Sequence, residues 1–212
     1  MAKSRADYAQ FSQDDVKVVK KETPFKGYFQ IDVYTIQHRI HEGGWTKPIT
    51  REVFERGHAS AMLPYDPVKD IVILIEQFRP GAYAAGNNPW LLEVPAGIIE
   101  DGQTPKDVAI RETTEETGCE AKRVEFIADY IVTPGGSSET IHLYCVEVDS
   151  DEALDHAGLE EEGEHIRVLK MSSAEAFELL NNGHMHNSTG IIALQWLKLH
   201  HNNIREKWCE NK

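Results

Sequence analysis

The stretch 97–119, GIIEDGQTPKDVAIRETTEETGC, constrains this chain more than any other part of it. Its second half carries the signals of a short helix with defined ends. Thr104 is a typical N-cap residue, and Pro105 suits the first helical position. Gly118 can close the helix in the left-handed conformation. The stretch therefore predicts a loop followed by a helix that starts at Pro105 and stops before Gly118.

Three carboxylates gather inside this predicted helix, at Glu112, Glu115 and Glu116. At about 100° per residue they share roughly a third of the helix circumference. Like charges at these spacings cost about 0.2–0.5 kcal/mol per pair, so folding alone does not account for the cluster. A hard divalent cation would, because it prefers carboxylate oxygens. We expect Glu112 and Glu116 to be the first ligands, with Glu115 binding or bridging a second ion; the alternative is a solvated acidic helix.

The same stretch resembles the Nudix box, written G-x5-E-x7-R-E-U-x-E-E-x-G-U, where U is a bulky apolar residue. The matching positions are Gly97, Arg111, Glu112, Glu115, Glu116 and Gly118. Three positions depart from the pattern, because Gln103 replaces the first glutamate while Thr113 and Cys119 replace larger aliphatic residues. The resemblance implies the α+β class, with a mixed α/β/α sandwich, and metal-assisted hydrolysis of a diphosphate. We expect Arg111 to pair with the glutamates and orient them.

Length and charge set further limits. The 212 residues suit one domain with a small extension, and we expect an N-terminal strand region over 1–50 and the hydrolase domain over 51–212. A net charge of −13 argues against a nucleic-acid surface, which needs a basic patch. Three cysteines without metal-ligand spacing favour a reducing compartment. Since no apolar run approaches the ~18 residues of a membrane span, we expect a cytoplasmic protein without membrane contact.

The remaining pattern predicts strands with helices at intervals. Residues 1–25 are polar and only weakly patterned, and 79–89 and 149–164 read as loops. Strands are expected over 28–40, 58–65, 70–78, 90–95, 123–132, 139–148 and 165–171. A capping box from Ser172 to Glu175 predicts a helix that ends near Gly183, and 188–208 has the periodicity of a terminal helix.

Beyond the box, the chain is similar to the bacterial ADP-ribose pyrophosphatases within the Nudix family. The likeness extends over most of the chain after about residue 27 and includes 51–59, 75–83, 90–100, 134–139 and 191–201. Pro134 stands 16 residues after Gly118, and a proline at that distance is the family's usual mark of ADP-ribose specificity. The resemblance implies Mg²⁺-dependent cleavage of ADP-ribose to AMP and ribose 5-phosphate, with Mn²⁺ as an alternative metal and two or more ions in each site.

The resemblance also assigns roles to single residues. The metal shell would be the Ala96 carbonyl, Glu112, Glu116 and Glu164, and the general base would be Glu162. Substrate contacts would come from Tyr28, Phe29, Arg51, Glu52, Arg56, Arg79, Ile98, Thr133, Pro134, Gly135 and Glu139. The family forms homodimers with exchanged N-terminal strands, so residues near 28 and 51–52 would serve the other subunit's site, and 133–135 would lie where a partner subunit's loop touches substrate.

Other interpretations stay open at this stage. The enzyme could take another nucleoside diphosphate sugar or a dinucleotide. A non-catalytic ADP-ribose sensor is favoured by Gln103 and opposed by the intact run from Arg111 to Glu116. The glutamates at 160–164 could be a solvated loop, and Tyr28 and Phe29 could be ordinary sheet residues.

Overall fold

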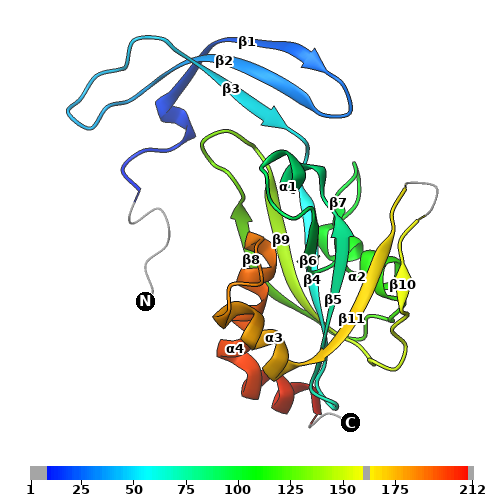
Figure 1. Cartoon of the computed structure of the whole chain (residues 1–212). Helices are drawn as coiled ribbons and strands as arrows, with labels where there is room; N and C mark the ends of the chain where they lie inside the picture. The colour runs from blue at the N-terminus through cyan, green and yellow to red at the C-terminus, as the bar shows by residue number, and fades with distance from the viewer. Residues whose placement is uncertain (1–8, 160–162, 210–212) are drawn as a thin grey trace. The chain divides into compact units, whose positions relative to one another are not determined.

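The computed structural model describes residues 9–159 and 163–209. The chain divides into two compact units (Figure 1). One, which we call the N-terminal unit, joins Met1–Gly57 to Thr133–Glu139; the other, the core unit, joins His58–Val132 to Thr140–Lys212. The sequence-based boundary at residue 50 stays a prediction.

The N-terminal unit is built on a three-stranded antiparallel sheet in the order β1-β2-β3. Its elements are a 3-10 turn at Gln13–Asp15, β1 (Val16–Lys26), β2 (Gln30–His38) and β3 (Ile49–Glu55). Strand β1 falls in the stretch that looked only weakly patterned. Every residue of β1 is exposed, so it has no buried face to produce an alternating sequence, and pairing with β2 holds it in place.

The core unit carries the remaining elements. They are β4 (Ala59–Asp66), β5 (Ile71–Phe78), α1 (Pro80–Ala84), β6 (Trp90–Glu93), β7 (Ala96–Ile98), α2 (Pro105–Thr117), β8 (Val124–Ile131), β9 (Thr140–Glu147), β10 (His156–Ala157), β11 (Ile166–Ser172), α3 (Ser173–Asn181) and α4 (Ser188–Cys209). The sheet order is β10-β11-β5-β4-β9-β8, with β6 on β5 and β7 on β4. Strands β4 and β9 run parallel, and the other pairs are antiparallel.

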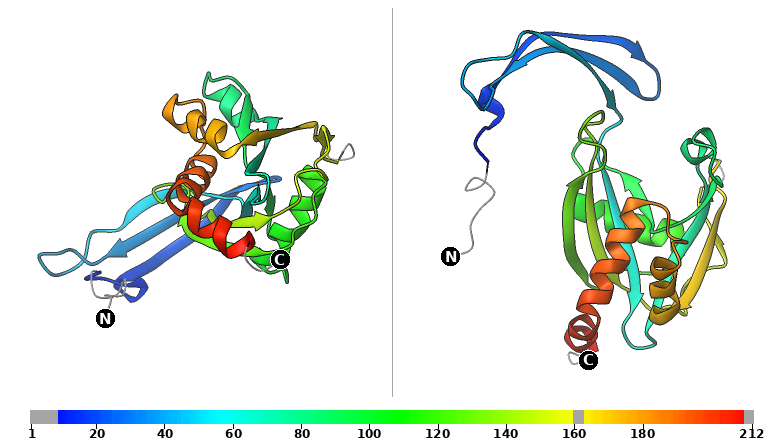
Figure 2. Two further views of the ribbon diagram at one scale, coloured as in Figure 1. Left: turned by 90° about the horizontal axis from the view of Figure 1, so that it is seen from below. Right: turned by 60° about the vertical axis from the view of Figure 1, so that its left-hand side comes forward.

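Alternation along the central strands gives this sheet two apolar faces. Leu74 of β5 packs in a cluster with Leu194 of α4 and Ala176 of α3. Its neighbours Ile73 and Ile75 point the other way, into a cluster with Ala109 of α2. Figure 2 shows α2 on one side of the sheet and α3 and α4 on the other. This arrangement confirms the expected α+β sandwich.

The helix ends follow the signals in the sequence. The Thr104 hydroxyl accepts a hydrogen bond from the Asp107 amide, and Gly118 ends α2 with φ of 81°. Ser172 and Glu175 form the predicted capping box of α3. No helix among the described residues is both long and apolar enough to cross a membrane.

Besides β1, the strand β3 and three short elements were absent from the sequence-based prediction. The three short elements are α1, β7 and β10. Helix α1 lies inside the predicted loop 79–89, and β10 lies inside the predicted loop 149–164. Strand β7 continues the chain just past the strand that was expected over 90–95. Each has five residues or fewer, which is too short for a periodic signal, and pairing with neighbouring strands creates β7 and β10.

Candidate active site

The backbone at the start of the box lies directly against the glutamates of α2. The Ala96 amide donates a hydrogen bond of 2.9 Å to Glu116 Oε2. A Cβ atom at Gly97 would lie 1.8 Å from Glu112 Oε1, so only glycine fits this approach. Pairing of β7 with β4 fixes that backbone, with Ala96 opposite Ala61. Glu112 and Glu116 therefore face the same strand.

Arg111 forms ion pairs with two glutamates of α2, Glu112 and Glu115. Its guanidinium lies 2.7 Å from Glu112 Oε1 and also donates to Glu115. This confirms the expectation that Arg111 pairs with glutamates of the box; that it orients them stays a prediction. Because Arg111 already occupies one oxygen of each carboxylate, its removal would free both side chains to rotate.

Burial gives these carboxylates unusual electrostatics. Glu116 is only 3% exposed, and burial, with the nearby charges of Glu112 and Glu164, raises its pKa to about 8 despite the Ala96 amide and Arg79. Burial also raises the pKa of Glu112, although Arg111 opposes the shift. The protein thus holds acidic groups where it does not fully compensate their negative charge, and a bound cation would favour the ionised forms.

The expected ligands fit a hard divalent cation in their chemistry, because they are carboxylate and carbonyl oxygens. In residues 9–159 and 163–209, however, no three side chains of His, Cys, Asp or Glu already form a metal-binding group. Glu164 is half-buried, and its amide donates to the Leu159 carbonyl at 3.1 Å. The expected base, Glu162, lies outside the described residues.

Arg79 stands at the start of α1, where Nε donates to Glu93 Oε2 at 2.7 Å. Its charge lowers the pKa of Glu116, which places Arg79 in the electrostatic neighbourhood of the box glutamates. The sequence analysis did not select Glu93. A signal was present, since Glu93 is a single acid within the apolar strand β6 and its side chain is only 13% exposed.

The N-terminal unit holds a second set of the expected residues. The Arg56 guanidinium lies 2.8 Å from Glu139 Oε1 and stacks over Phe29, 5.6 Å from the ring centroid. Phe29 also meets Phe54 edge to face, while Tyr28 is 86% exposed. The arrangement offers a cation and aromatic faces to a ligand.

The other predicted substrate contacts lie on β3, on β7 and in the turn that begins at residue 133. Arg51 and Glu52 are exposed on β3, and the Arg51 guanidinium donates to the Thr50 carbonyl. Residues 133–135, which include Pro134, enter a tight turn in which the Gly136 and Ser137 amides donate to the Thr133 carbonyl. Ile98 is half-buried on β7, opposite Ala59.

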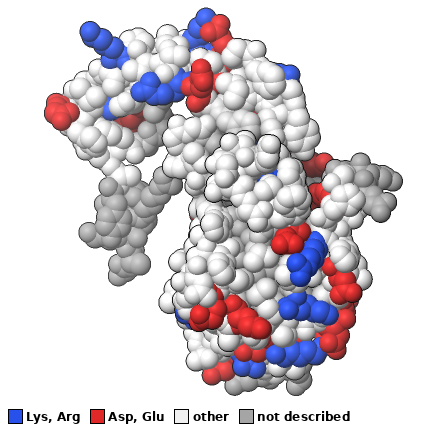
Figure 3. Space-filling model, in the orientation of Figure 1, with Lys and Arg blue, Asp and Glu red and all other residues white. Residues whose placement is uncertain are grey.

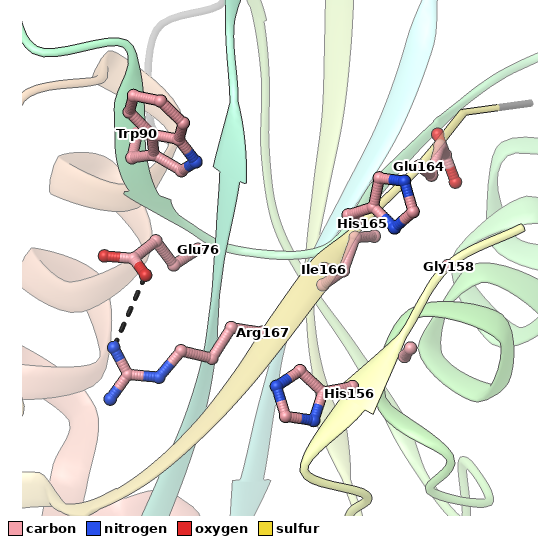
Figure 4. A pocket seen from close by; sticks show the side chains of 9 residues that line it. Glu76, Trp90, His156, Gly158, Glu164, His165, Ile166 and Arg167 are labelled. Atoms are coloured by element: carbon pink, nitrogen blue, oxygen red, sulfur yellow. Dashed lines mark hydrogen bonds and ion pairs between the residues drawn. The ribbon is translucent and has the colours of Figure 1, made fainter. Parts of the chain in front are cut away.

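A pocket of about 360 Å³ opens on the core unit (Figure 4). It is lined by Glu76, Trp90, His156, Ala157, Gly158, Glu164, His165, Ile166 and Arg167. Glu76 and Arg167 form an ion pair of 3.4 Å across β5 and β11. Their chain neighbours Ile75 and Val168 pack toward α2, so alternation turns Glu76 and Arg167 to the opposite face of the sheet.

Charge is mixed on the face drawn in Figure 3, where acidic side chains accompany the basic ones on the core unit. In the core unit, Lys69 forms ion pairs with Asp66, Asp149 and Asp151. Arg56, Arg79 and Arg111 are likewise each paired with a glutamate.

Comparisons with known proteins identify a domain family and similar enzymes. Residues 55–198 match the model of the NUDIX domain. The chain is 42% identical over 199 residues to the ADP-ribose pyrophosphatase of Escherichia coli strain K12, covering 94% of this chain and 95% of that one. It is 37% identical over 209 residues to the ADP-ribose pyrophosphatase of Haemophilus influenzae, covering 97% and 96%.

The chain is also similar, at lower sequence identity, to a second kind of pyrophosphatase and to a solved structure. A GDP-mannose pyrophosphatase of Yersinia enterocolitica is 31% identical over 187 residues, covering 87% of this chain and 96% of that one. Among solved structures, a crystal structure of an ADP compounds hydrolase superposes with a TM-score of 0.69 at 20% identity, covering 92% of this chain and 100% of that one. At that identity the structural match concerns the fold alone.

Proposed function

The chain belongs to the Nudix family, and from this premise we propose that it hydrolyses the diphosphate of ADP-ribose to AMP and ribose 5-phosphate, with Mg²⁺ as its metal. The observation that carries the proposal is the packing of Ala96 and Gly97 against Glu116 and Glu112. It places oxygen donors beside a glycine loop, as phosphoryl chemistry requires. Identity of 42% and 37% to curated ADP-ribose pyrophosphatases supports the substrate.

In this proposal the carboxylates hold the metal or accept a proton, and an arginine binds the diphosphate. Glu112 and Glu116, with the Ala96 carbonyl and Glu164, would hold the metal, and Glu115 would bind or bridge a second ion. A divalent cation in such a site neutralises charge on the phosphoryl oxygens and lowers the pKa of water. Arg79 would bind the diphosphate, and Glu162 would accept the proton of the attacking water.

The adenosine end would be recognised by the N-terminal unit. Phe29 and Tyr28 offer aromatic faces for the adenine, and Arg56 with Glu139 offers polar contacts for the ribose. Arg51, Glu52, Ile98 and residues 133–135 complete the proposed contacts.

We also propose a homodimer in the cytoplasm, with the N-terminal strands exchanged. Strand β1 supports it, because Val16, Val18, Val19 and Phe25 are all exposed apolar side chains. The test mixes two inactive variants, Arg51→Ala and Glu116→Gln, after unfolding and refolding together. Exchanged subunits would restore one intact site in each mixed dimer and recover activity, whereas a monomer or an unshared site would leave the mixture inactive.

The activity itself is tested directly. Purified protein is incubated with ADP-ribose and Mg²⁺, and the products are identified by mass spectrometry, with Glu116→Gln as the control for contaminating hydrolases. AMP and ribose 5-phosphate are expected. Tight binding without turnover would instead favour a sensor. In parallel, Glu162→Gln should lower kcat more than KM, and unchanged values would move the role of base to a neighbouring glutamate.

A second substrate class has specific support. The GDP-mannose pyrophosphatases match at 31% identity, below the 42% of the ADP-ribose enzymes. The incubation therefore includes GDP-mannose and a dinucleotide, and kcat/KM is compared across the panel. A higher value for GDP-mannose than for ADP-ribose would reassign the substrate while leaving the diphosphate chemistry in place.

A further inference from the structure

One buried amide on β5 has no hydrogen-bond partner in the part of the chain that the structure describes. Gln77 is 6% exposed, and its Nε2 atom makes no hydrogen bond within the described residues. It interrupts an apolar strand whose neighbouring positions include Ile73, Leu74 and Ile75. Burying an amide donor without a partner destabilises a protein, so a glutamine here calls for another explanation than packing.

The strand pairing places this amide beside the candidate site. Gln77 alternates with Ile75 and therefore faces the side of the sheet that α2 covers. Across β6 its partner is Leu91, and Glu93 lies one pair further along the same face, opposite Ile75. Across β11 the antiparallel register ends with Arg167 opposite Glu76, the residue before Gln77.

Gln77 is close in sequence to Arg79, the residue that we propose to bind the diphosphate. Arg79 lies two residues after Gln77, directly beyond the end of β5, and its side chain donates a hydrogen bond to Glu93. The charge of Arg79 reaches Glu116, and Glu164 influences the pKa of both Glu112 and Glu116. Along the chain, Gln77 thus stands between Ile75, which packs toward α2, and Arg79, which pairs with Glu93.

We propose that the Gln77 amide donates a hydrogen bond to a phosphoryl oxygen of the bound substrate and is a substrate-binding residue of this enzyme. A neutral amide suits the position better than a lysine or arginine, because an unpaired buried cation costs far more to desolvate. Its desolvated N–H group meets an anionic oxygen without first breaking a bond to protein. The inference rests on the proposed diphosphate hydrolysis.

The test replaces Gln77 by methionine, which keeps the length of the side chain and removes the donor. The expected result is a loss of roughly 10- to 100-fold in kcat/KM for ADP-ribose, mostly through KM, with a melting temperature equal to or above the wild type. Metal-free calorimetry should show weaker ADP-ribose binding by a similar factor. Gln77→Glu should lose at least as much, because it adds a negative charge.

The matched control is Glu76→Met, the adjacent residue on the opposite face of the same strand, which should keep the wild-type kcat/KM. An activity of Gln77→Met within twofold of wild type would overturn the proposal. A clear fall in its melting temperature would also overturn it, since it would show that the amide has a protein partner. If wild-type protein does not cleave ADP-ribose at all, the proposed function has failed, and the metal-free binding measurement still decides the role of Gln77.

Discussion

Arg79 Nε lies 2.7 Å from Glu93 Oε2, so an ion pair joins the start of α1 to the end of β6. The hydrogen bond is donated by Nε. The planar fork of a guanidinium can then bind a phosphate through two N–H groups while a carboxylate fixes its orientation. Glu93 is therefore a positioning residue for Arg79.

Replacing Glu93 by glutamine should raise KM for ADP-ribose several-fold and leave kcat within about twofold, because Arg79 loses a charged anchor and samples more orientations. Steady-state kinetics measure both constants. In an Arg79→Gln background the same replacement should add little, since the two side chains act together. Additive losses in the double variant would mean that Glu93 does not act through Arg79.

Replacing either Glu112 or Glu116 by glutamine should lower turnover at least about 100-fold at ordinary Mg²⁺ concentrations, while the chain still folds. For Glu116→Gln the metal-free melting temperature should stay equal or rise, because burial already disfavours the charged form of this side chain. Circular dichroism and product assays check both. Glu120→Gln, an exposed glutamate just beyond α2, is the control and should keep full activity.

The sequence was sufficient to predict α2, because its ends depend on local chemistry. Thr104, Pro105 and Gly118 act within a few residues of one another, and the structure has the cap, the first turn and the left-handed end at these positions. The capping box of α3 is predictable for the same reason. The ion pair between Arg111 and Glu115 also follows from their i,i+4 spacing, whereas the pair with the adjacent Glu112 does not.

Contacts between distant strands could not be predicted in this way. Glu93 and Gln77 gain their meaning from the register of β5 with β6, which periodicity within one strand does not specify. The close approach of Gly97 to Glu112 likewise depends on pairing between β7 and β4. Strand β1 was missed because no burial pattern marks an exposed strand.

Gly97→Ala should lower kcat/KM at least about tenfold and lower the melting temperature by several degrees. The added methyl group would occupy the space of the Glu112 carboxylate, so either the side chain or β7 must move. Gly81→Ala is the matched control in α1, where an added Cβ meets nothing within 4 Å. That variant should be as active as wild type and slightly more stable. Equal behaviour of the two variants would contradict the close packing of Gly97 and Glu112.

The pH dependence of stability should report on Glu116. Its pKa is raised from an ordinary value of 4.5 to about 8 in the folded protein, mainly by burial. The folded state therefore holds a proton that the unfolded state releases between these values, and the free energy of unfolding of metal-free protein should fall as pH rises through that window. Added Mg²⁺ binds the ionised form, so saturating Mg²⁺ should remove this pH dependence.

Thermal unfolding with and without Mg²⁺, at pH 6 and at pH 8, measures this linkage. The increase in melting temperature on adding Mg²⁺ should be larger at pH 8, and calorimetry in buffers of different ionisation enthalpy should detect proton release on binding at pH 7. In Glu116→Gln the metal-free pH dependence should flatten between pH 5 and 8, because the titrating group is gone. A metal effect of the same size at both pH values would mean that Glu116 is not a ligand, since a ligand with this pKa must lose its proton to bind.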